Sequence, residues 1–414
     1  MIRQPVYVTG IGFAGAAGSG AAALAERLRA GRSAVRRLGR EEQPIPLLKI
    51  GALLEAGWDW RETEGARGLS PRALERAEKY LRGADVSLRA DAAALLEAKG
   101  AADIAPGRLG LVVGGSNLAG WALAEEASRF RRNPAHVNPR IGFQGLDTHV
   151  AATLAALADA QGPVMNVAAA AASGAVAAVA ALDLIRGGRC DACLAVGAMQ
   201  RLTPVDWQAL AALGALNTSA DPAPPFSAGG GGFTPGEGAA CVLLERADHA
   251  TRRGAAGLAV LAGGAFVSAA DPLPHPSRSH AARAMALALA DAGIEPGQVD
   301  LVTAHATGTA QGDAAEAGAV ADVMESSQRR VWVAAPKAVT GHCLGAAGLV
   351  GLVATVSMLQ DGRVYPVPAM PPSLSALLRF AAEGAIDIPL CCAINNAFGF
   401  GGFNAALAIR NLPG

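Results

Sequence analysis

The sequence contains few charged and few aromatic residues, and its charges cancel. Charged residues make up 17% and aromatic residues 4% of the 414 positions, and Lys+Arg and Asp+Glu each number 35. A nucleic-acid-binding domain usually carries a basic patch and a basic net charge, so this balance argues against that class of protein. It leaves room for a local basic patch that binds an acidic protein.

Cysteine is also scarce, with six residues in the chain. Cys190 and Cys193 form one C-x-x-C motif, but the second pair or the nearby histidines of a zinc site are missing, and no disulfide framework is indicated. The first five residues lead directly into a predicted strand at residues 6–9, without a signal-peptide pattern. We therefore expect a reduced, cytoplasmic protein without a metal.

Long strongly hydrophobic runs are missing as well, although 51% of the residues are hydrophobic. The longest apolar run is rich in alanine, contains Ser173 and Gly174, and is closed by Asp183 and Arg186. Alanine is only weakly apolar, so this run predicts a buried helix and not a membrane span. The length predicts about two to three domains with a large core.

Predicted strands alternate with predicted helices, which is typical of an α/β fold. Residues 162–187 and 333–361 are alike, because each predicts a strand, a turn and a helix rich in small residues. This likeness predicts two related halves, residues 1–254 and 255–414, whose helices pack closely in the middle. The predicted strands are 6–9, 108–114, 164–167, 191–198, 237–245, 257–266, 299–304, 331–335, 390–394 and 405–409. Helices are predicted to begin at Ser70-Pro71 and to span 149–160, 280–292 and 344–359.

A glycine pattern near the N-terminus, Gly10-x-Gly12-x-x-Gly15, has the form of a dinucleotide-binding fingerprint. The acidic residue that such a site needs about 20 positions later is missing. In a chain with 51 glycines, the pattern is better explained by a tight turn between a strand and a helix.

The segment around Ala171 has the form of a reactive site. A predicted strand at 164–167 is followed by a sharp turn and by a helix that contains Ser173 and ends near Gly187. The first N–H groups of a helix have no partner within it, so such turns often hold a nucleophile or bind an anion. Here the turn is made of alanines, and Ala171 offers no reactive group.

Polar residues gather in three segments of the second half, 304–316, 337–342 and 395–404. His305 and His342 each follow a predicted strand and lie beside small residues and hydroxyls. Only seven histidines occur in the chain. Two of them in such similar positions indicate a site.

Together these motifs resemble the β-ketoacyl synthases of the thiolase superfamily, the condensing enzymes of fatty-acid and polyketide synthesis. The resemblance implies a thiolase-like α/β fold with two pseudo-repeated halves in α-β-α-β-α layers. It also implies a homodimer, or a heterodimer with a paralogous ketosynthase. The residues that carry it are VYVTGIG, GPVMNVAAAAASG, PFSAGGGGFTPGEGAA, AHATGTAQGDAAE, KAVTGHCLGAAG and NNAFGFGG, in the family's order.

The resemblance also implies site residues. The family's nucleophilic cysteine falls on Ala171, its two histidines fall on His305 and His342, and its acid falls on Glu316. The lysine that positions the second histidine falls on Lys337. Hydroxyls that contact phosphopantetheine fall on Thr307 and Thr309, and the phenylalanines of the glycine loop are Phe398 and Phe400, of which Phe400 is the gate.

The chemistry that the family performs needs all of these parts. A cysteine thiolate attacks an acyl thioester, backbone N–H groups hold the oxyanion, and two neutral imidazoles stabilise the enolate left when a malonyl thioester loses CO₂. Ala171 removes the nucleophile. The other departures from the family's pattern are Ala306, Ser227, Gly230, Gly231 and Ala397.

Three functions stay open. The first is a β-ketoacyl synthase whose cysteine has been replaced, so that this chain alone performs no condensation. The second is a cysteine-free partner subunit of an active ketosynthase, similar to a chain-length factor. The third is a malonyl-carrier decarboxylase that uses the histidines alone. A nicotinamide-dependent oxidoreductase, resting only on the glycine pattern, receives little support.

The expected partner is an acyl carrier protein, which the family binds through basic surface. Arg72, Arg76 and Lys79 are the first candidates, because helical spacing places them on one face. The alternatives are Arg129, Arg131 and Arg132. No cofactor is expected beyond the phosphopantetheine arm that the carrier supplies.

Overall fold

The computed structural model describes residues 4–227, 230–273, 275–367 and 376–412. Eleven of its strands form one mixed sheet in the order β12-β10-β9-β14-β15-β8-β1-β7-β6-β4-β5. The five strands of the first half are β1 (Val6–Gly15), β4 (Leu109–Gly114), β5 (Val164–Val167), β6 (Ala192–Gly197) and β7 (Gly238–Arg246). Those of the second half are β8 (Ala259–Ser268), β9 (Leu301–Thr303), β10 (Val331–Ala334), β14 (Cys392–Gly399) and β15 (Phe403–Arg410), and β12 (Leu378–Arg379) extends its edge.

The two groups of five strands have the same topology. We number the five strands of each group along the chain and read the sheet outward from the junction of β1 with β8. In both groups the order is then first, fifth, fourth, second, third. The first two pairings are antiparallel and the last two parallel in both groups. The groups join where β1 meets β8, with Val8 opposite Ala259. This repetition is the pseudo-symmetry that the similar segments predicted.

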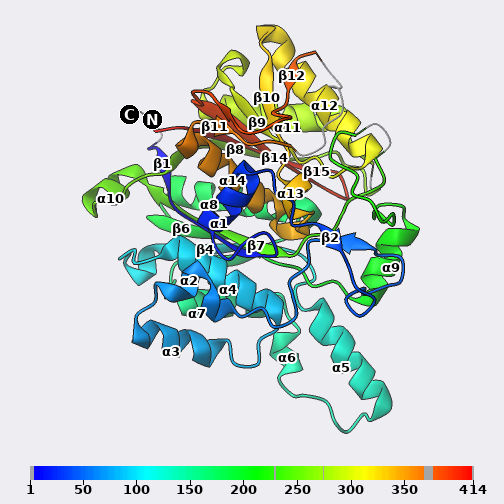
Figure 1. Cartoon of the computed structure of the whole chain (residues 1–414). Helices are drawn as coiled ribbons and strands as arrows, with labels where there is room; N and C mark the ends of the chain where they lie inside the picture. Colours follow the sequence, from blue (N-terminus) through cyan, green and yellow to red (C-terminus); the bar gives the residue numbers. More distant parts are fainter. Residues whose placement is uncertain (1–3, 228–229, 274, 368–375, 413–414) are drawn as a thin grey trace.

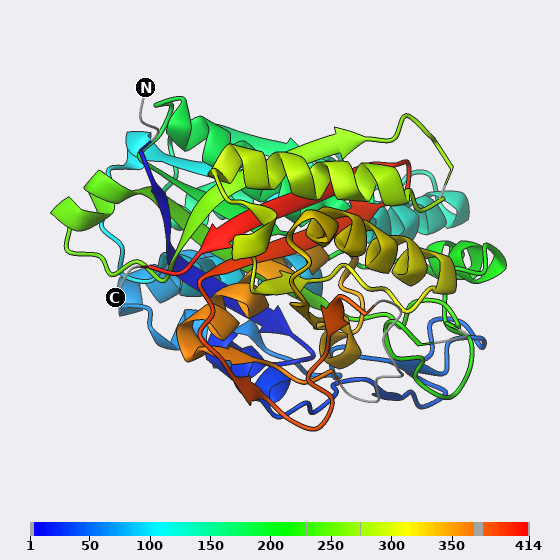
Figure 2. The ribbon, with the colours of Figure 1, turned by 90° about the horizontal axis from the view of Figure 1, so that it is seen from above.

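Helices complete five layers, which Figures 1 and 2 show. The helices α8 (Ser173–Arg186) and α14 (Ala347–Asp361) lie in the middle and contact strands of both halves. The helices α4 (Val86–Lys99) and α7 (Thr148–Ala158) cover the outer face of the first half. The helices α11 (Arg278–Ala292) and α12 (Ala310–Met324) cover that of the second.

The two central helices approach each other through small residues. A Cβ atom at Gly348 would lie 2.6 Å from the backbone nitrogen of Ala175, and one at Gly174 would lie 3.0 Å from the carbonyl oxygen of Gly345. The stretch Leu344–Asp361 is long and apolar enough to cross a membrane, but 83% of it is buried inside the molecule, as befits a core helix. The predicted close packing of these helices is confirmed.

The remaining elements lie around this body. The two-stranded pieces are β2 (Arg36–Arg37) with β3 (Ile50–Gly51), and β11 (Arg363–Val364) with β13 (Ile386–Asp387). The other helices are α1 (Ala21–Arg29), α2 (Glu64–Arg67), α3 (Pro71–Tyr80), α5 (Gly120–Arg132), α6 (Ile141–Gln144), α9 (Pro204–Ala212), α10 (Ala247–Arg252) and α13 (Lys337–Thr340). The predicted start of α3 is confirmed, because the Ser70 hydroxyl accepts a bond from the N–H of Ala73.

The expectation of a tight turn at the N-terminal glycines was wrong. Strand β1 continues through them to Gly15. A Cβ atom at Gly10 would lie 1.9 Å from the carbonyl oxygen of Ala98, and one at Gly12 would lie 2.0 Å from that of Ala94. The glycines therefore let α4 lie directly on the strand, and they form no dinucleotide site.

Candidate active site

Ala171 lies where the resemblance placed the nucleophile. The chain leaves β5, forms a short 3₁₀ turn at Ala170–Ala172 and enters α8 at Ser173. The Ser173 hydroxyl accepts a bond from the N–H of Ala169 at 2.9 Å and donates one to the carbonyl of Ala170 at 2.6 Å. Ala170 has φ +49°, a left-handed conformation that costs a non-glycine residue about 1 kcal/mol. The turn before α8 is thus strained, and at Ala171 it carries a methyl group, which has no nucleophilic atom.

The glycine loop packs against this elbow. A Cβ atom at Gly399 would lie 2.3 Å from the carbonyl oxygen of Ala169 and 3.2 Å from the nitrogen of Ala171. Strand β14 extends to Gly399, so the loop is shorter than predicted. Because a side chain is excluded here, backbone N–H groups of both segments can approach a thioester carbonyl.

His305 follows β9 and is held through its backbone by Glu316 of α12. The Glu316 carboxylate accepts bonds from the N–H groups of His305 at 2.8 Å and Ala306 at 2.7 Å, and from the Asn396 amide at 3.0 Å. Burial raises the pKa of Glu316, and these three donors oppose that rise. Glu316 therefore positions the backbone of His305, and it also lines the cavity that His305 lines.

Lys337 is hydrogen-bonded to His305, and among the described residues no hydrogen bond joins it to His342, so its role in positioning His342 stays a prediction. Its ammonium donates to the His305 carbonyl oxygen and lies 3.4 Å from His305 Nδ1. Burial lowers the pKa of Lys337 to about 8, against the attraction of Glu316. Burial, Lys337 and His342 together push the pKa of His305 well below its usual value. A donor at Nδ1 and a neutral ring leave the proton of His305 on Nε2.

His342 sits beside His305 with its backbone fixed. Its N–H donates to the Thr234 carbonyl at 2.8 Å, and its ring meets that of His305 edge-on at 5.5 Å between centroids. The ring of Phe233 packs against it at 5.1 Å. Burial, and then Lys337, lower the pKa of His342 well below its usual value. Both imidazoles are therefore neutral at pH 7.

One cavity of about 850 Å³ brings the predicted residues together. Ala171, His305, His342, Thr307, Thr309, Phe398 and Phe400 all line it. Ala209 and Leu210 of α9 also line it, as does Leu213 directly after that helix. The two threonine hydroxyls lie 3.0 Å apart, and the Phe398 ring lies 5.6 Å from that of His305. Phe400 is 46% exposed, and its role as a gate stays a prediction.

The sequence predictions gave no role to Asp313, although it stands in a quoted motif. Its buried carboxylate accepts bonds from the N–H groups of Phe226 at 2.5 Å and Gly308 at 3.2 Å. A Cβ atom at Gly230 would lie 2.4 Å from the Gly308 carbonyl. Asp313 and Gly230 therefore hold the threonine segment against the loop before Phe233, of which residues 228–229 lie outside the described part.

The two sets of candidate docking cations lie in different places. Arg72, Arg76 and Lys79 are exposed on α3, which lies across the molecule from the cavity-lining α9 in Figure 1. Arg131 and Arg132 are exposed on α5, on the same side of that view as α9. For a carrier whose arm enters the cavity of the same chain, α5 is the better placed.

Comparison with known proteins decides the family. Residues 3–250 match the beta-ketoacyl synthase N-terminal domain, and residues 258–370 match its C-terminal domain. The chain belongs to the beta-ketoacyl synthase family. It thus shares the thiolase-like ketosynthase fold of the proteins of fatty-acid and polyketide biosynthesis.

Its relatives within this family differ in activity. The malonyl-ACP decarboxylase PksF of polyketide biosynthesis in Bacillus subtilis is 29% identical over 98% of this chain and 96% of its own. The ishigamide ketosynthase/chain length factor aligns with a TM-score of 0.84 at 25% identity, over 99% of this chain and 100% of its own. The AntDE:AntF complex, a ketosynthase with its acyl-carrier protein, aligns with a TM-score of 0.81 at 25% identity and the same coverage.

Proposed function

We propose that this chain decarboxylates a malonyl thioester carried by an acyl carrier protein and performs no condensation. The observation that carries the proposal is that two buried, neutral imidazoles line the same cavity as Ala171. Condensation needs a covalent acyl-enzyme, which alanine cannot form. Decarboxylation needs only a site that stabilises the enolate.

The proposed reaction balances without a cofactor. The bond between the malonyl carboxylate and C2 breaks, its electron pair moves into the thioester as an enolate, and CO₂ leaves. A proton then adds to C2 and gives an acetyl thioester. Neutral N–H donors stabilise the enolate oxygen best when they are aimed at the place where its charge develops. The exclusion of water from a buried site also removes the hydration of the carboxylate and so favours its loss.

The test uses the chain as it stands with malonyl-loaded acyl carrier protein. We expect mass spectrometry to find the acetyl-loaded carrier, and to find no ketoacyl product when an acyl-loaded carrier is added. The Ala171→Cys variant restores the nucleophile and is expected to gain condensation. A ketoacyl product formed by the unaltered chain would contradict the proposal.

The carrier is expected to dock on α5. Charge reversal at Arg131→Glu and Arg132→Glu should weaken carrier binding at least 10-fold, since acidic partners are held by complementary charge. Arg72→Glu with Arg76→Glu is the matched control on α3. Binding measured by surface plasmon resonance at low salt decides between them, and a greater loss from the α3 pair would reverse the assignment.

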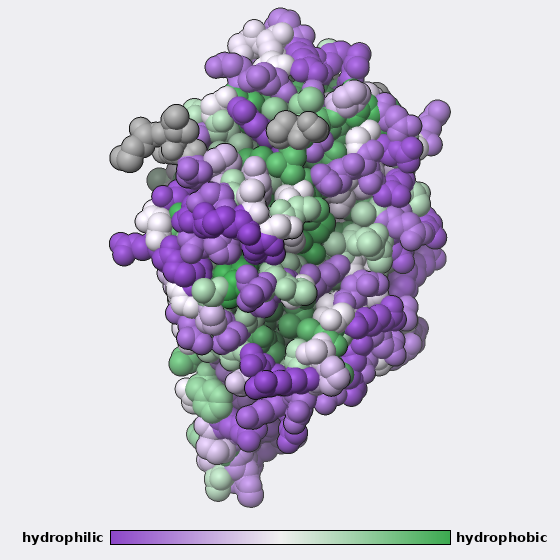
Figure 3. Space-filling view, turned by 90° about the vertical axis from the view of Figure 1, so that its left-hand side faces the viewer, coloured by the Kyte–Doolittle hydropathy of each residue, from purple (hydrophilic) through white to green (hydrophobic). Residues whose placement is uncertain are grey.

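A second candidate function is a partner subunit of a cysteine-bearing ketosynthase. It rests on β5, an edge strand whose Val164 and Met165 are 39% and 37% exposed. Apolar residues of α5 and α6, Phe130 and Phe143, are about half exposed on the arm at the foot of Figure 1. Separately, the face of the molecule that forms the left-hand side of Figure 1 carries a band of hydrophobic residues among polar ones, which Figure 3 shows. Co-expression with a cysteine-bearing paralogue tests this role, which a stable heterodimer would support.

A further inference from the structure

The enolate left by decarboxylation needs a proton at C2, and the site holds a chain of groups that can supply it. Lys337 Nζ lies 3.4 Å from His305 Nδ1, and His305 lines the cavity beside Ala171. Lys337 itself lies outside that cavity wall, in the turn that follows β10. Its hydrogen-bonded connection to the cavity therefore runs through His305.

A neutral imidazole alone is a poor acid. Loss of its Nε2 proton would leave an anion, which a buried site does not tolerate. If Nδ1 receives a proton while Nε2 gives one up, the ring stays neutral throughout. Lys337 is the group in contact with Nδ1 that carries such a proton.

We infer that Lys337 and His305 form a proton relay that delivers the proton to C2 of the enolate. This inference rests on the proposed decarboxylation. The Nε2–H bond of His305 breaks as the C2–H bond forms, and an ammonium proton of Lys337 passes to Nδ1. After the acetyl thioester leaves, Nε2 takes a proton from water in the cavity and Nδ1 returns its proton to Lys337, while the hydroxide that remains combines with CO₂ to give bicarbonate.

The surroundings of Lys337 suit this role. Among the described residues it forms no ion pair with a carboxylate that would hold its proton, and the acids that act on it are Glu316 and Asp313 from α12. The other titratable groups near it are the two histidines and Cys343, whose thiol has its pKa raised to about 12 by burial. Burial lowers the pKa of Lys337 to about 8, so it yields a proton more readily than an ordinary lysine.

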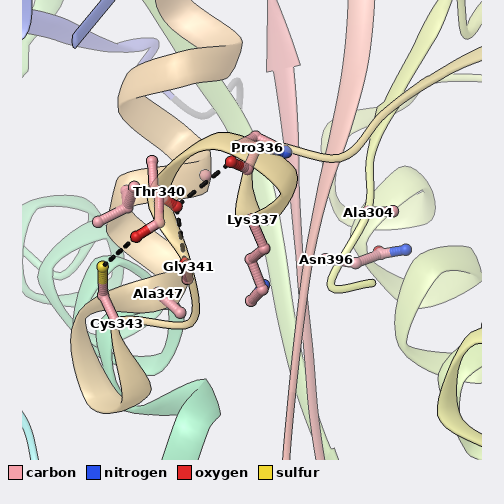
Figure 4. A pocket seen from close by; sticks show the side chains of 10 residues that line it. Ala304, Pro336, Lys337, Thr340, Gly341, Cys343, Ala347 and Asn396 are labelled. Atoms are coloured by element: carbon pink, nitrogen blue, oxygen red, sulfur yellow. Dashed lines mark hydrogen bonds between the residues drawn. The ribbon is translucent and has the colours of Figure 1, made fainter. Parts of the chain in front are cut away.

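A small space adjoins Lys337. Figure 4 shows Lys337 between the turn Pro336–Gly341 and Asn396 of β14. The space measures about 10 Å³, close to the volume that one water molecule needs. It is lined by Gly351 and Ala347 of α14, which leave it unfilled.

The first test is the pH dependence of acetyl-carrier formation. The unaltered chain should lose rate above pH 8, as the Lys337 ammonium deprotonates. Lys337→Arg keeps a cation and hydrogen-bond donors but holds its protons too tightly to pass them on. We expect it to be at least 100-fold slower, as loss of a general acid would be, with no fall in rate near pH 8. An arginine variant with the unaltered rate and profile would overturn the relay.

The second test does not need activity and so separates the relay from the proposed function. In the protein labelled with ¹⁵N-histidine, the Nδ1 and Nε2 shifts of His305 should change together near pH 8, and Lys337→Met should abolish that step. Thermal unfolding at an unchanged temperature shows that the variant is folded. If the His305 shifts of the Lys337→Met variant follow the same pH curve as those of the unaltered chain, the relay is overturned. If the shifts depend on Lys337 but no CO₂ is released, only the proposed decarboxylation is contradicted.

Discussion

At the scale of residues, the site has, among the described residues, no nucleophilic thiolate side chain that could carry an acyl group. Ala171 supplies no nucleophile, and the one thiol near the histidines, Cys343, is buried and bonded toward the Thr340 carbonyl. Burial raises the pKa of that thiol to about 12, so it carries no thiolate at neutral pH. No neighbouring cysteine in the described part therefore takes over the missing role. The two histidines, with Glu316 and Lys337 bonded to the backbone of His305, are the polar groups that are left for chemistry.

Ala306 has a positive φ angle, a backbone conformation that glycine adopts more easily than alanine. Its φ is +33°, in the left-handed region that favours glycine. The substitution Ala306→Gly should therefore raise the free energy of unfolding by about 1 kcal/mol, because it relieves this strain. Chemical denaturation measures the change.

The matched control is Ala304→Gly, at a buried residue two positions earlier that has no positive φ. Its extra backbone freedom should lower stability by about 0.5–1 kcal/mol. If both variants lose stability, Ala306 is not strained.

At the scale of elements, the strands were predictable and several helices were not. Buried strands appear as short apolar runs, and each of the ten predicted strands has a counterpart in the sheet. Helix α4 was missed because ten of its fourteen residues are buried, which erases the amphipathic period. Helix α12 was missed because its polar start, from Ala310 to Glu316, resembles a loop.

The site could be predicted better than the elements around it. His305 and His342 follow strands in the sequence, and parallel strand ends meet at one edge of a sheet. The contact of Lys337 with His305 was not predictable, because it depends on how α13 turns after β10. The continuation of β1 through Gly10 and Gly12 was not predictable either, because it depends on the packing of α4 against these glycines, and α4 itself was not predicted.

The contact of α4 with β1 gives an element-scale prediction. Gly12→Ala would place a Cβ atom 2.0 Å from the Ala94 carbonyl, so α4 must move off the strand. We expect a loss of more than about 3 kcal/mol, as for a strongly overpacked core. Gly107→Ala, where a Cβ atom meets nothing within 4 Å, should leave the thermal midpoint nearly unchanged. Equal melting of the two variants would disprove the close packing.

At the scale of the whole molecule, the repeated halves place the site at their junction. Ala171 comes from the first half and the two histidines from the second, so neither half contains a complete site. The central helices, which meet at Gly174 and Gly348, fix the distance between them. Strand β5 pairs with β4 on one side and ends the sheet on the other, so its outer edge is open to a strand of a further chain.

That edge predicts a dimer. Met165→Lys should convert a dimer into a monomer or weaken it at least 10-fold, because a charge would be buried in an apolar interface. Leu287→Lys on the exposed face of α11 is the control and should change nothing. Light scattering after size exclusion measures the mass. A monomeric unaltered chain would rule out the interface for a homodimer and leave only the heterodimer.

The central claim is tested most directly by the rate of CO₂ release from malonyl-loaded acyl carrier protein. The account predicts release by the unaltered chain and at least a 100-fold lower rate in His305→Ala, since the variant loses one neutral donor to the enolate. Carrier binding by that variant should be unchanged. No release by the unaltered chain, or an equal rate in the variant, would contradict the account.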